Sequence, residues 1–244
     1  MLENKNILVS GGTGAIGKSI CLKSANYGAN VAFTFLSKQE EAEELSSNIK
    51  KLGRQCYKAC VDARNKEAIE QFCKQVEDLF GHIDILVNNL GATQVMPFAL
   101  IEEDDWDDMM QINLKSMFLF SKAVVRGMIR RKKGVILNLG SIAGHRLVEV
   151  PVHYATAKAG VSGFTTSLAK ELSRYGIRVN EVCPGLIDGG IGTNVSERQM
   201  KTYNEFCSLN RPGTPDEVAE MVTFLASDRS SYINAQRMVI DGGL

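Results

Sequence analysis

The sequence lacks several features that mark membrane, secreted or nucleic-acid-binding proteins. None of its 244 residues belongs to an uncharged apolar run of about 18 residues, and no apolar segment precedes the first strand-like residues. Neither a membrane span nor a secretory signal is therefore expected. A charge excess is missing as well, because 28 basic residues balance 28 acidic ones. This balance disfavours nucleic acid and anionic membranes as partners.

Paired metal-ligand motifs are also missing. The six cysteines are scattered, with no C-x-x-C spacing and no neighbouring histidine pair, so no metal site is expected. Such cysteines are typical of reduced thiols, and we expect a cytoplasmic protein. Repeats and low-complexity segments are absent too. The length suffices for one hydrophobic core, so we expect a single domain over residues 1–244.

Short β-rich runs alternate with amphipathic segments along the whole chain. This alternation predicts an α/β fold, a Rossmann-type doubly wound parallel sheet of about seven strands with helices on both faces. The expected strands are 7–10, 31–35, 55–61, 83–88, 135–139, 177–183 and 237–240. The expected helices are 16–27, 39–52, 66–80, 104–131, 152–175 and 215–226.

One stretch, residues 186–211, interrupts the alternation. It starts with glycine and polar residues and is longer than an ordinary connection in an α/β fold. We expect it to be a substrate lid that contains a short helix.

A glycine-rich turn follows the first expected strand. Gly12, Gly14 and Gly17 satisfy G-x-G-x-x-G between a strand and a helix, which is the setting in which this motif binds a dinucleotide. Glycine lets the backbone approach a pyrophosphate and aims helix N–H groups at it. A turn that merely tolerates glycine is the less favoured interpretation, because four glycines fall within seven residues.

The end of the second strand indicates which dinucleotide is bound. An NAD site usually has a carboxylate there for the ribose 2′-OH, but this chain has Ser37 and Lys38, which suit a 2′-phosphate. NADP(H) is therefore favoured over NAD(H), with a simple solvated lysine as the alternative. Asp62 and the run Asn88-Asn89-Leu90-Gly91 also fall at strand ends, where they either line the cofactor cleft or serve as turn residues.

The stretch 138–158 carries a hydroxyl, a phenol and an amine. Tyr154 and Lys158 are four residues apart, so on a helix they share one face, and Ser141 precedes Tyr154 by thirteen residues at the end of an apolar strand. A free phenol has a pKa of about 10 and needs a nearby positive charge to exchange protons near neutrality. The alternative is an exposed Tyr-Lys pair with a loop serine.

These motifs together resemble the short-chain dehydrogenase/reductase family over nearly the whole chain. The matching motifs are Ser10-Gly11-x-x-x-Ala15-x-Gly17, Asn88-Asn89-Leu90-Gly91, Asn113, Ser141, Tyr154-x-x-x-Lys158, Pro184-Gly185 and Val239-Ile240-Asp241-Gly242-Gly243. The run from Arg211 to Ala219 looks most like the 3-oxoacyl-[acyl-carrier-protein] reductases. The chain departs from the family at Ala15, Leu90 and Gly189, where the family has glycine, alanine and threonine.

The resemblance implies a role for each matching residue. Tyr154 would be the acid, Lys158 would hold the nicotinamide ribose, Ser141 would bind the substrate oxygen, and Asn113 would anchor a water that links the lysine to solvent. The residues expected to contact the cofactor are Gly11, Thr13, Gly14, Ala15, Ile16, Gly17, Ser37, Lys38, Asp62, Asn89, Gly91, Tyr154, Lys158, Pro184, Gly185 and Ile187. His145 and His153 are expected to be substrate-loop or surface residues.

The expected function is NADPH-dependent reduction of a 3-ketoacyl thioester bound to acyl-carrier protein, in fatty-acid or polyketide-type synthesis. The alternatives are an enzyme of the same family acting on a free ketone, sugar or secondary alcohol, and a dinucleotide-binding module without catalysis. A basic cluster has two possible roles: it docks the acidic carrier, or three of its residues, Arg130, Arg131 and Lys132, cap a helix C-terminus. The cluster consists of these three residues and Arg174. The resemblance also implies a homo-oligomer, a tetramer or dimer.

Overall fold

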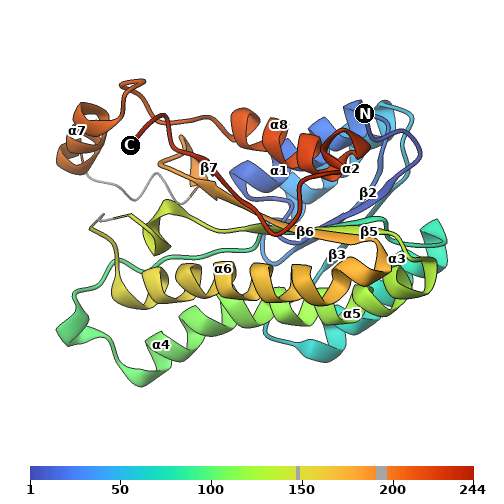
Figure 1. The fold of residues 1–244 in the computed structure, drawn as a ribbon, viewed down its shortest axis with the longest axis horizontal. Helices are drawn as coiled ribbons and strands as arrows, with labels where there is room; N and C mark the ends of the chain where they lie inside the picture. The colour runs from blue at the N-terminus through green and yellow to red at the C-terminus, as the bar shows by residue number, and fades with distance from the viewer. Residues whose placement is uncertain (147–148, 191–196) are drawn as a thin grey trace.

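A computed structural model describes residues 1–146, 149–190 and 197–244 and shows a sheet covered by helices on both faces (Figure 1). Seven strands run parallel in the order β3-β2-β1-β4-β5-β6-β7. They are β1 (Asn6–Val9), β2 (Asn30–Phe35), β3 (Cys56–Cys60), β4 (Ile85–Asn88), β5 (Gly134–Leu139), β6 (Ile177–Pro184) and β7 (Arg237–Ile240). The predicted doubly wound parallel sheet is confirmed.

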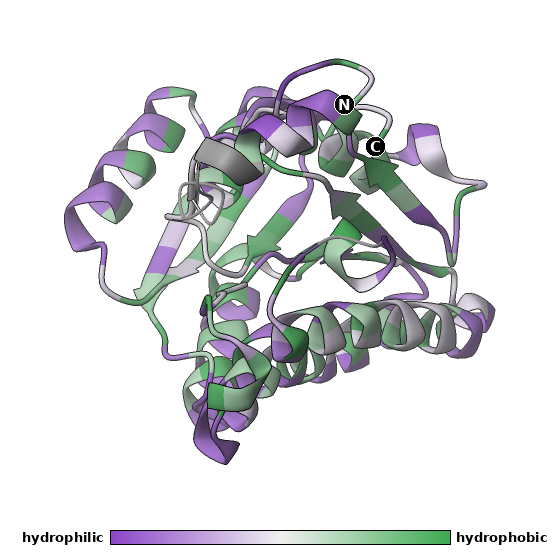
Figure 2. Cartoon of the chain, turned by 90° about the vertical axis from the view of Figure 1, so that its left-hand side faces the viewer, coloured by the Kyte–Doolittle hydropathy of each residue, from purple (hydrophilic) through white to green (hydrophobic). Residues whose placement is uncertain are grey.

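Two layers of helices enclose the sheet. One face is covered by α1 (Ala15–Asn26), α2 (Gln39–Lys51) and α8 (Pro215–Ala226), and the other by α3 (Lys66–Phe80), α5 (Ser116–Arg131) and α6 (Val152–Leu172). Because both faces are covered, β1 and β4 are buried along their whole length and consist mainly of apolar residues. Figure 2 shows the hydrophobic residues concentrated along the strands between the helical layers.

The strand order creates a crevice at one edge of the sheet. After β3 the chain crosses back to place β4 on the other side of β1, so the direction of winding reverses between β1 and β4. At such a switch point the connections after the two strands diverge to opposite faces, and ligands bind at the carboxyl ends of the strands. The glycine-rich turn follows β1, and Asn89 to Gly91 follow β4. The fold therefore brings both motifs to this crevice.

One predicted helix is wrong in detail. Residues 104–131 form α4 (Glu103–Met110), a π-helical turn (Gln111–Lys115) and α5, rather than one helix. A π turn inserts an extra residue without breaking the amphipathic pattern on either side, which is why periodicity did not reveal it. The remaining boundaries differ from the predicted ones by a few residues; for example, the strand predicted at 83–88 begins at Ile85.

The short helix predicted within 186–211 is present as α7 (Glu197–Phe206). Residues 191–196 of this stretch lie outside the described part of the chain. Its end is anchored at α8, where the Arg211 guanidinium donates to both carboxylate oxygens of Glu217, at 3.0 and 2.7 Å. Within the described ranges, no helix combines the length and the apolar character needed to cross a bilayer.

Candidate active site

The glycine-rich turn between β1 and α1 leaves no room for side chains at Gly12 and Gly17. A Cβ on Gly17 would collide with the Gly11 carbonyl oxygen, and one on Gly12 would lie 2.7 Å from Phe33. Gly11 itself has a φ of +71°, which favours glycine. Gly14 is the N-cap of α1 and has no side chain to satisfy the N–H groups of the first helical turn. The turn therefore offers backbone donors to an anion such as a pyrophosphate.

Asn89 holds this turn in place from the neighbouring strand. Its Nδ2 donates to the carbonyl oxygens of Ser10 at 3.1 Å and Gly11 at 3.0 Å, and its N–H donates to the Ser10 hydroxyl at 3.0 Å. The Asn89 side chain, which was predicted to contact the cofactor, is thus hydrogen-bonded to the protein backbone. It shapes the crevice by fixing the glycine-rich turn. Gly91, two residues further on, is half-buried beyond the end of β4.

The segment after β6 forms the opposite wall of the crevice. Pro184 ends β6, and the Gly185 N–H donates to the Ile240 carbonyl oxygen at 2.8 Å. Ile187 is buried against the core below α8. A Cβ on Gly189 would lie 3.5 Å from the Cβ of Ala15 in the first turn of α1. The segment after β6 therefore lies close to the first turn of α1, next to half-buried Thr13 and Ile16.

The residues expected at the ribose end lie beyond β2 and β3. Ser37 and Lys38 are exposed, and the Lys38 ammonium is 3.8 Å from Glu41. Asp62 accepts hydrogen bonds from the Arg64 guanidinium, which lowers the pKa of the Asp62 carboxyl. Arg64 was missed from the sequence, although its position two residues after Asp62 could have indicated it. It brings a second cation to this edge of the sheet.

Ser141, Tyr154 and Lys158 come together where β5 ends and α6 begins. Ser141 caps the short 3-10 turn Ile142–Gly144, and its hydroxyl accepts from the Ala143 N–H at 3.1 Å. Burial raises the pKa of the Tyr154 phenol, and a hydrogen bond with Ser141 lowers it by a smaller amount. The Lys158 ammonium lies 5.9 Å from the centre of the Tyr154 ring. The three side chains therefore form one cluster, as their spacing predicted.

Lys158 is deeply buried for a lysine. Its side chain is almost fully covered, and its ammonium donates to the Leu139 carbonyl oxygen at 2.9 Å. Burial lowers the pKa of Lys158 to about 8, against the opposing effect of Cys183 and Glu181. The amine is thus mostly protonated at neutral pH and can release its proton slightly above it. That property suits a group that exchanges protons with a neighbour.

Asn113 lies in the π turn and is almost completely buried. Its Nδ2 donates to the carbonyl oxygens of Ala92 at 3.0 Å and Met109 at 3.1 Å, and its Oδ1 accepts from the Ala92 N–H at 3.2 Å. The amide therefore ties the segment after β4 to the turn between α4 and α5. π turns occur often at functional sites. A water held here for Lys158 stays a prediction.

The two histidines were expected in the substrate loop or on the surface, and neither is an exposed surface residue. His153 is fully buried, and its Nδ1 accepts from the Tyr154 N–H at 3.0 Å, while its Nε2 has no partner within the described part of the chain. The first turns of α6 pack against α4, so position 153 faces inward. His145 lies at the end of the 3-10 turn with its Nε2 3.0 Å from the Ser162 hydroxyl. His145 thus lies in the loop between β5 and α6, whereas the burial of His153 was not predicted.

The basic cluster lies away from this crevice. Arg130, Lys132 and Arg174 are exposed where α5 and α6 end, whereas Arg131 donates to the Ile83 carbonyl oxygen at 2.5 Å. Tyr154 lies near the other end of α6 (Figure 1). At 1.5 Å per residue the two ends of this helix are roughly 30 Å apart. The cluster therefore does not line the crevice of its own chain.

The crevice fits a nicotinamide dinucleotide. A turn suited to a pyrophosphate lies at its centre, where side chains are excluded at Gly11 and Gly17. Tyr154 and Lys158 lie beside it, at the carboxyl end of β5. Such a cofactor supplies or accepts a hydride when it is bound.

Comparison with known proteins supports this interpretation. The family model described as Enoyl-(Acyl carrier protein) reductase matches residues 12–244. The 3-oxoacyl-[acyl-carrier-protein] reductases of Vibrio cholerae and Thermotoga maritima are each 37% identical to the chain, over all of it and 98% of their own length. A short-chain dehydrogenase/reductase from Serratia marcescens superposes with a TM-score of 0.93 at 30% identity, covering 99% of this chain and 98% of that one. Levodione reductase gives the same TM-score at 26% identity, covering 100% and 98%.

The family model spans nearly the whole chain, and relatives well above 30% identity are covered almost completely. The chain therefore belongs to the short-chain dehydrogenase/reductase family and is an NAD(P)-dependent oxidoreductase that acts on a ketone or an alcohol, similar to the 3-oxoacyl-[acyl-carrier-protein] reductases.

Proposed function

We propose that the protein reduces a 3-ketoacyl thioester, carried on an acyl-carrier protein, to the 3-hydroxyacyl thioester with NADPH, in fatty-acid or polyketide-type biosynthesis. The observation that carries the reduction is the cluster of Ser141, Tyr154 and Lys158 beside the glycine-rich turn. The substrate class rests on the similarity to 3-oxoacyl-[acyl-carrier-protein] reductases over the full chain.

The side chains of the cluster divide the chemistry between them. NADPH supplies the hydride to the carbonyl carbon. The Ser141 hydroxyl, which already contacts the phenol, binds the substrate oxygen. Tyr154 has a raised pKa, so its phenol is protonated at neutral pH and gives its proton to that oxygen. The Lys158 ammonium stabilises the phenolate that remains, and its pKa of about 8 lets it return a proton from solvent.

NADPH is favoured over NADH by the residues at the ribose end. No carboxylate follows β2 directly, where Ser37 and Lys38 are exposed instead. A hydroxyl and an ammonium can both donate to a 2′-phosphate, whereas a carboxylate would repel it. Arg64 adds a further cation at the end of the neighbouring strand, although its guanidinium is shared with Asp62.

The choice of substrate is tested by following NADPH absorbance. Acetoacetyl-carrier protein, acetoacetyl-N-acetylcysteamine and a panel of free ketones and sugars are compared at equal concentration. We expect kcat/KM for the carrier thioester to exceed that for every free ketone. Faster turnover of a free ketone or secondary alcohol would instead support the alternative substrate class, with the same chemistry.

We further propose that the carrier docks on the basic cluster and that the protein is a homo-oligomer, a tetramer or dimer. Because the cluster lies at the far end of α6 from Tyr154, docking there would serve the crevice of a neighbouring copy. Arg130→Glu combined with Arg174→Glu should raise KM for the carrier thioester about tenfold and leave the N-acetylcysteamine thioester unaffected. Lys74→Glu on α3 is the matched control, because Lys74 is also exposed. Equal KM values in the double variant and the control would refute docking at this cluster.

A further inference from the structure

A carboxylate is buried directly behind the proposed active site. Glu181 lies in the middle of β6 and is only 1% exposed, in a strand that is otherwise mostly apolar. Its Oε1 occupies the space that a Cβ on Gly140 would fill. Gly140 lies between Leu139, which binds the Lys158 ammonium, and Ser141. The carboxylate therefore packs against the backbone that carries both ends of the proposed active site.

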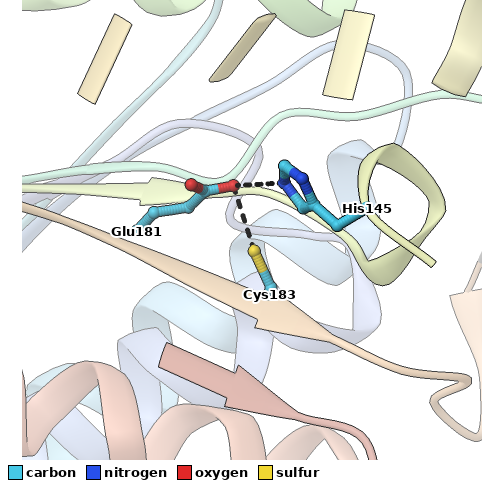
Figure 3. A group of neighbouring side chains, drawn as sticks. All are labelled: His145, Glu181 and Cys183. Carbon is cyan, nitrogen blue, oxygen red and sulfur yellow. Dashed lines mark hydrogen bonds and ion pairs between the residues drawn. The ribbon is translucent and has the colours of Figure 1, made fainter. Parts of the chain in front are cut away.

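Glu181 accepts hydrogen bonds at both carboxylate oxygens and faces two basic groups. Cys183 Sγ donates to Oε1 at 3.0 Å, and the Ser162 hydroxyl donates to Oε2. Two basic groups face the carboxylate: His145 Nε2 lies 3.7 Å from Oε1, and Arg237 Nε lies 3.8 Å from Oε2. Figure 3 shows Oε1 between the imidazole and the thiol. Both oxygens of the carboxylate are therefore engaged by neighbouring groups of the protein.

The network is connected to Lys158 through α6. Tyr154, Lys158 and Ser162 follow one another at intervals of four residues, so they lie on the same face of the helix. Among the residues that the structure describes, the charged and titratable groups that face Lys158 are Tyr154 on its own helix and Cys183 and Glu181 on β6. Of these, only Glu181 brings a negative charge at neutral pH, because burial and the neighbouring carboxylate raise the pKa of the Cys183 thiol.

We propose that Glu181 is a positioning residue that supplies the buried negative charge opposite the Lys158 ammonium, behind Gly140, and thereby sets the alkaline limit of the reduction. This inference rests on the proposed role of Lys158 as the cation beside Tyr154. Burial opposes the charged form of Lys158, and Glu181 favours it. Without the carboxylate the lysine loses its proton at lower pH, and Tyr154 loses the positive charge that stabilises its phenolate.

A metal site is the competing explanation of this cluster. The ligand atoms of His145, Glu181 and Cys183 lie within 4.8 Å of one another, and these residue types bind zinc. However, Ser162 and Arg237 already engage the second carboxylate oxygen, and the guanidinium charge opposes a cation. The thiol donates to the carboxylate and is therefore protonated, whereas a metal-bound cysteine is a thiolate. These contacts favour a charge network over a metal centre.

The test is the pH dependence of kcat/KM in the direction of reduction, with NADPH and the preferred substrate. Glu181→Gln keeps the shape of the side chain and an acceptor for Ser162 but removes the charge. We expect its alkaline limb to move to lower pH by roughly one unit, with activity near pH 6 retained. Cys183→Ala is the matched control, because it alters the same buried part of β6 and leaves the charge in place. Its alkaline limb should coincide with that of the wild type.

Two pH profiles would overturn the proposal: an unchanged alkaline limb in Glu181→Gln, or an equal shift of the limb in Cys183→Ala. A third contrary outcome is metal binding, in which the wild type retains stoichiometric zinc after dialysis against zinc and His145→Gln does not. Should Glu181→Gln fail to fold, Arg237→Met provides the test. Arg237 is 42% exposed, and its removal leaves the carboxylate unopposed, so the limb should move to higher pH. A shift of the alkaline limb of Arg237→Met to lower pH would also refute the proposal.

Lys158→Met separates this inference from the proposed function. If that variant keeps its activity, the proposed role of Lys158 fails. If it loses activity while Glu181→Gln keeps the wild-type profile, only the role of Glu181 fails.

Discussion

Tyr154 combines burial with contact to a hydroxyl, and both effects bear on its role as an acid. Burial is the larger of the two and keeps the phenol protonated at neutral pH. Removing the hydroxyl group in Tyr154→Phe should lower kcat by about 10²- to 10⁴-fold, the usual contribution of a general acid, and leave NADPH affinity nearly unchanged. Stopped-flow NADPH oxidation and a fluorescence titration measure the two quantities.

Tyr175→Phe is the control for this substitution. Tyr175 contacts Arg174 at the far end of α6, so its hydroxyl group is remote from the crevice. Similar losses of kcat in both variants, or equal activity of Tyr154→Phe and wild type, would contradict the proposed acid.

Lys158 is expected to reduce the stability of the fold. Its pKa in the folded protein, about 8, lies below the ordinary 10.5, so at neutral pH folding must bury a charge. Lys158→Met should therefore abolish activity and raise the free energy of unfolding by about 2 kcal/mol at pH 7, after allowance for the lost hydrogen bond to Leu139.

The sign of this effect can be checked against pH. Between about pH 8 and 10.5 the unfolded lysine binds more protons than the folded one. The free energy of unfolding of the wild type therefore rises toward that of Lys158→Met as pH increases through this window. Urea unfolding of both proteins at pH 7 and pH 9.5 measures the difference. A gap that widens at pH 9.5 would show that burial of charge is not its cause.

Ser37 is the residue at which cofactor preference can be changed. Ser37→Asp places a carboxylate where it accepts from a ribose 2′-OH and repels a 2′-phosphate. We expect the ratio of kcat/KM for NADPH to that for NADH to fall by about tenfold or more. Because Ser37 is exposed, the substitution should leave thermal stability unchanged. An unaltered ratio would mean that the 2′-phosphate is not recognised at this strand end.

At the scale of the secondary-structure elements, the turn before α1 offers a matched pair of glycine substitutions. A Cβ on Gly17 collides with the Gly11 carbonyl oxygen, whereas a Cβ on Gly14 meets the same atom at 3.6 Å, an ordinary contact. Gly17→Ala should lower the melting temperature and weaken NADPH binding, because the turn must open. Gly14→Ala should leave the melting temperature unchanged. Equal melting temperatures for the two variants would contradict the packing described for this turn.

The elements were predictable where burial follows a simple period. Strands covered on both faces appear as short apolar runs, so the alternation predicted the sheet and its helices. The π turn was not predictable, because the residues on either side keep the amphipathic spacing of one helix. Asn113 in this turn binds Ala92, which lies 21 residues away, and such a contact cannot be read from local periodicity.

The same distinction applies to the candidate site. Ser141, Tyr154 and Lys158 were predictable because their spacing fixes their approach once strand and helix are known. The inward position of His153 was not, since it depends on the packing of α6 against α4. The sequence placed the carboxylate of Glu181 inside a predicted buried strand, but its partners come from a turn, α6 and β7, which local sequence does not show.

At the scale of the whole molecule, the exposed apolar surface bears on assembly. Phe118 on α5 is 44% exposed, and we expect the proposed oligomer to bury this apolar side chain between copies. Phe118→Asp should convert the oligomer to smaller species, because a buried unpaired carboxylate is costly. Sedimentation velocity at several concentrations measures the change. A wild type that sediments as a stable monomer would refute the proposed assembly, and an unchanged variant would exclude this helix face.

Gly140 and Glu181 share a single volume inside the molecule, because the carboxylate occupies the place of a Cβ at position 140. A larger side chain at 140 would displace the carboxylate from this position and from its hydrogen bonds to Ser162 and Cys183. In the descent of the family, a change at either position is therefore expected to alter what is tolerated at the other. Homologues aligned at these two positions should therefore vary together, and a glutamate at 181 beside any larger residue at 140 should be rare.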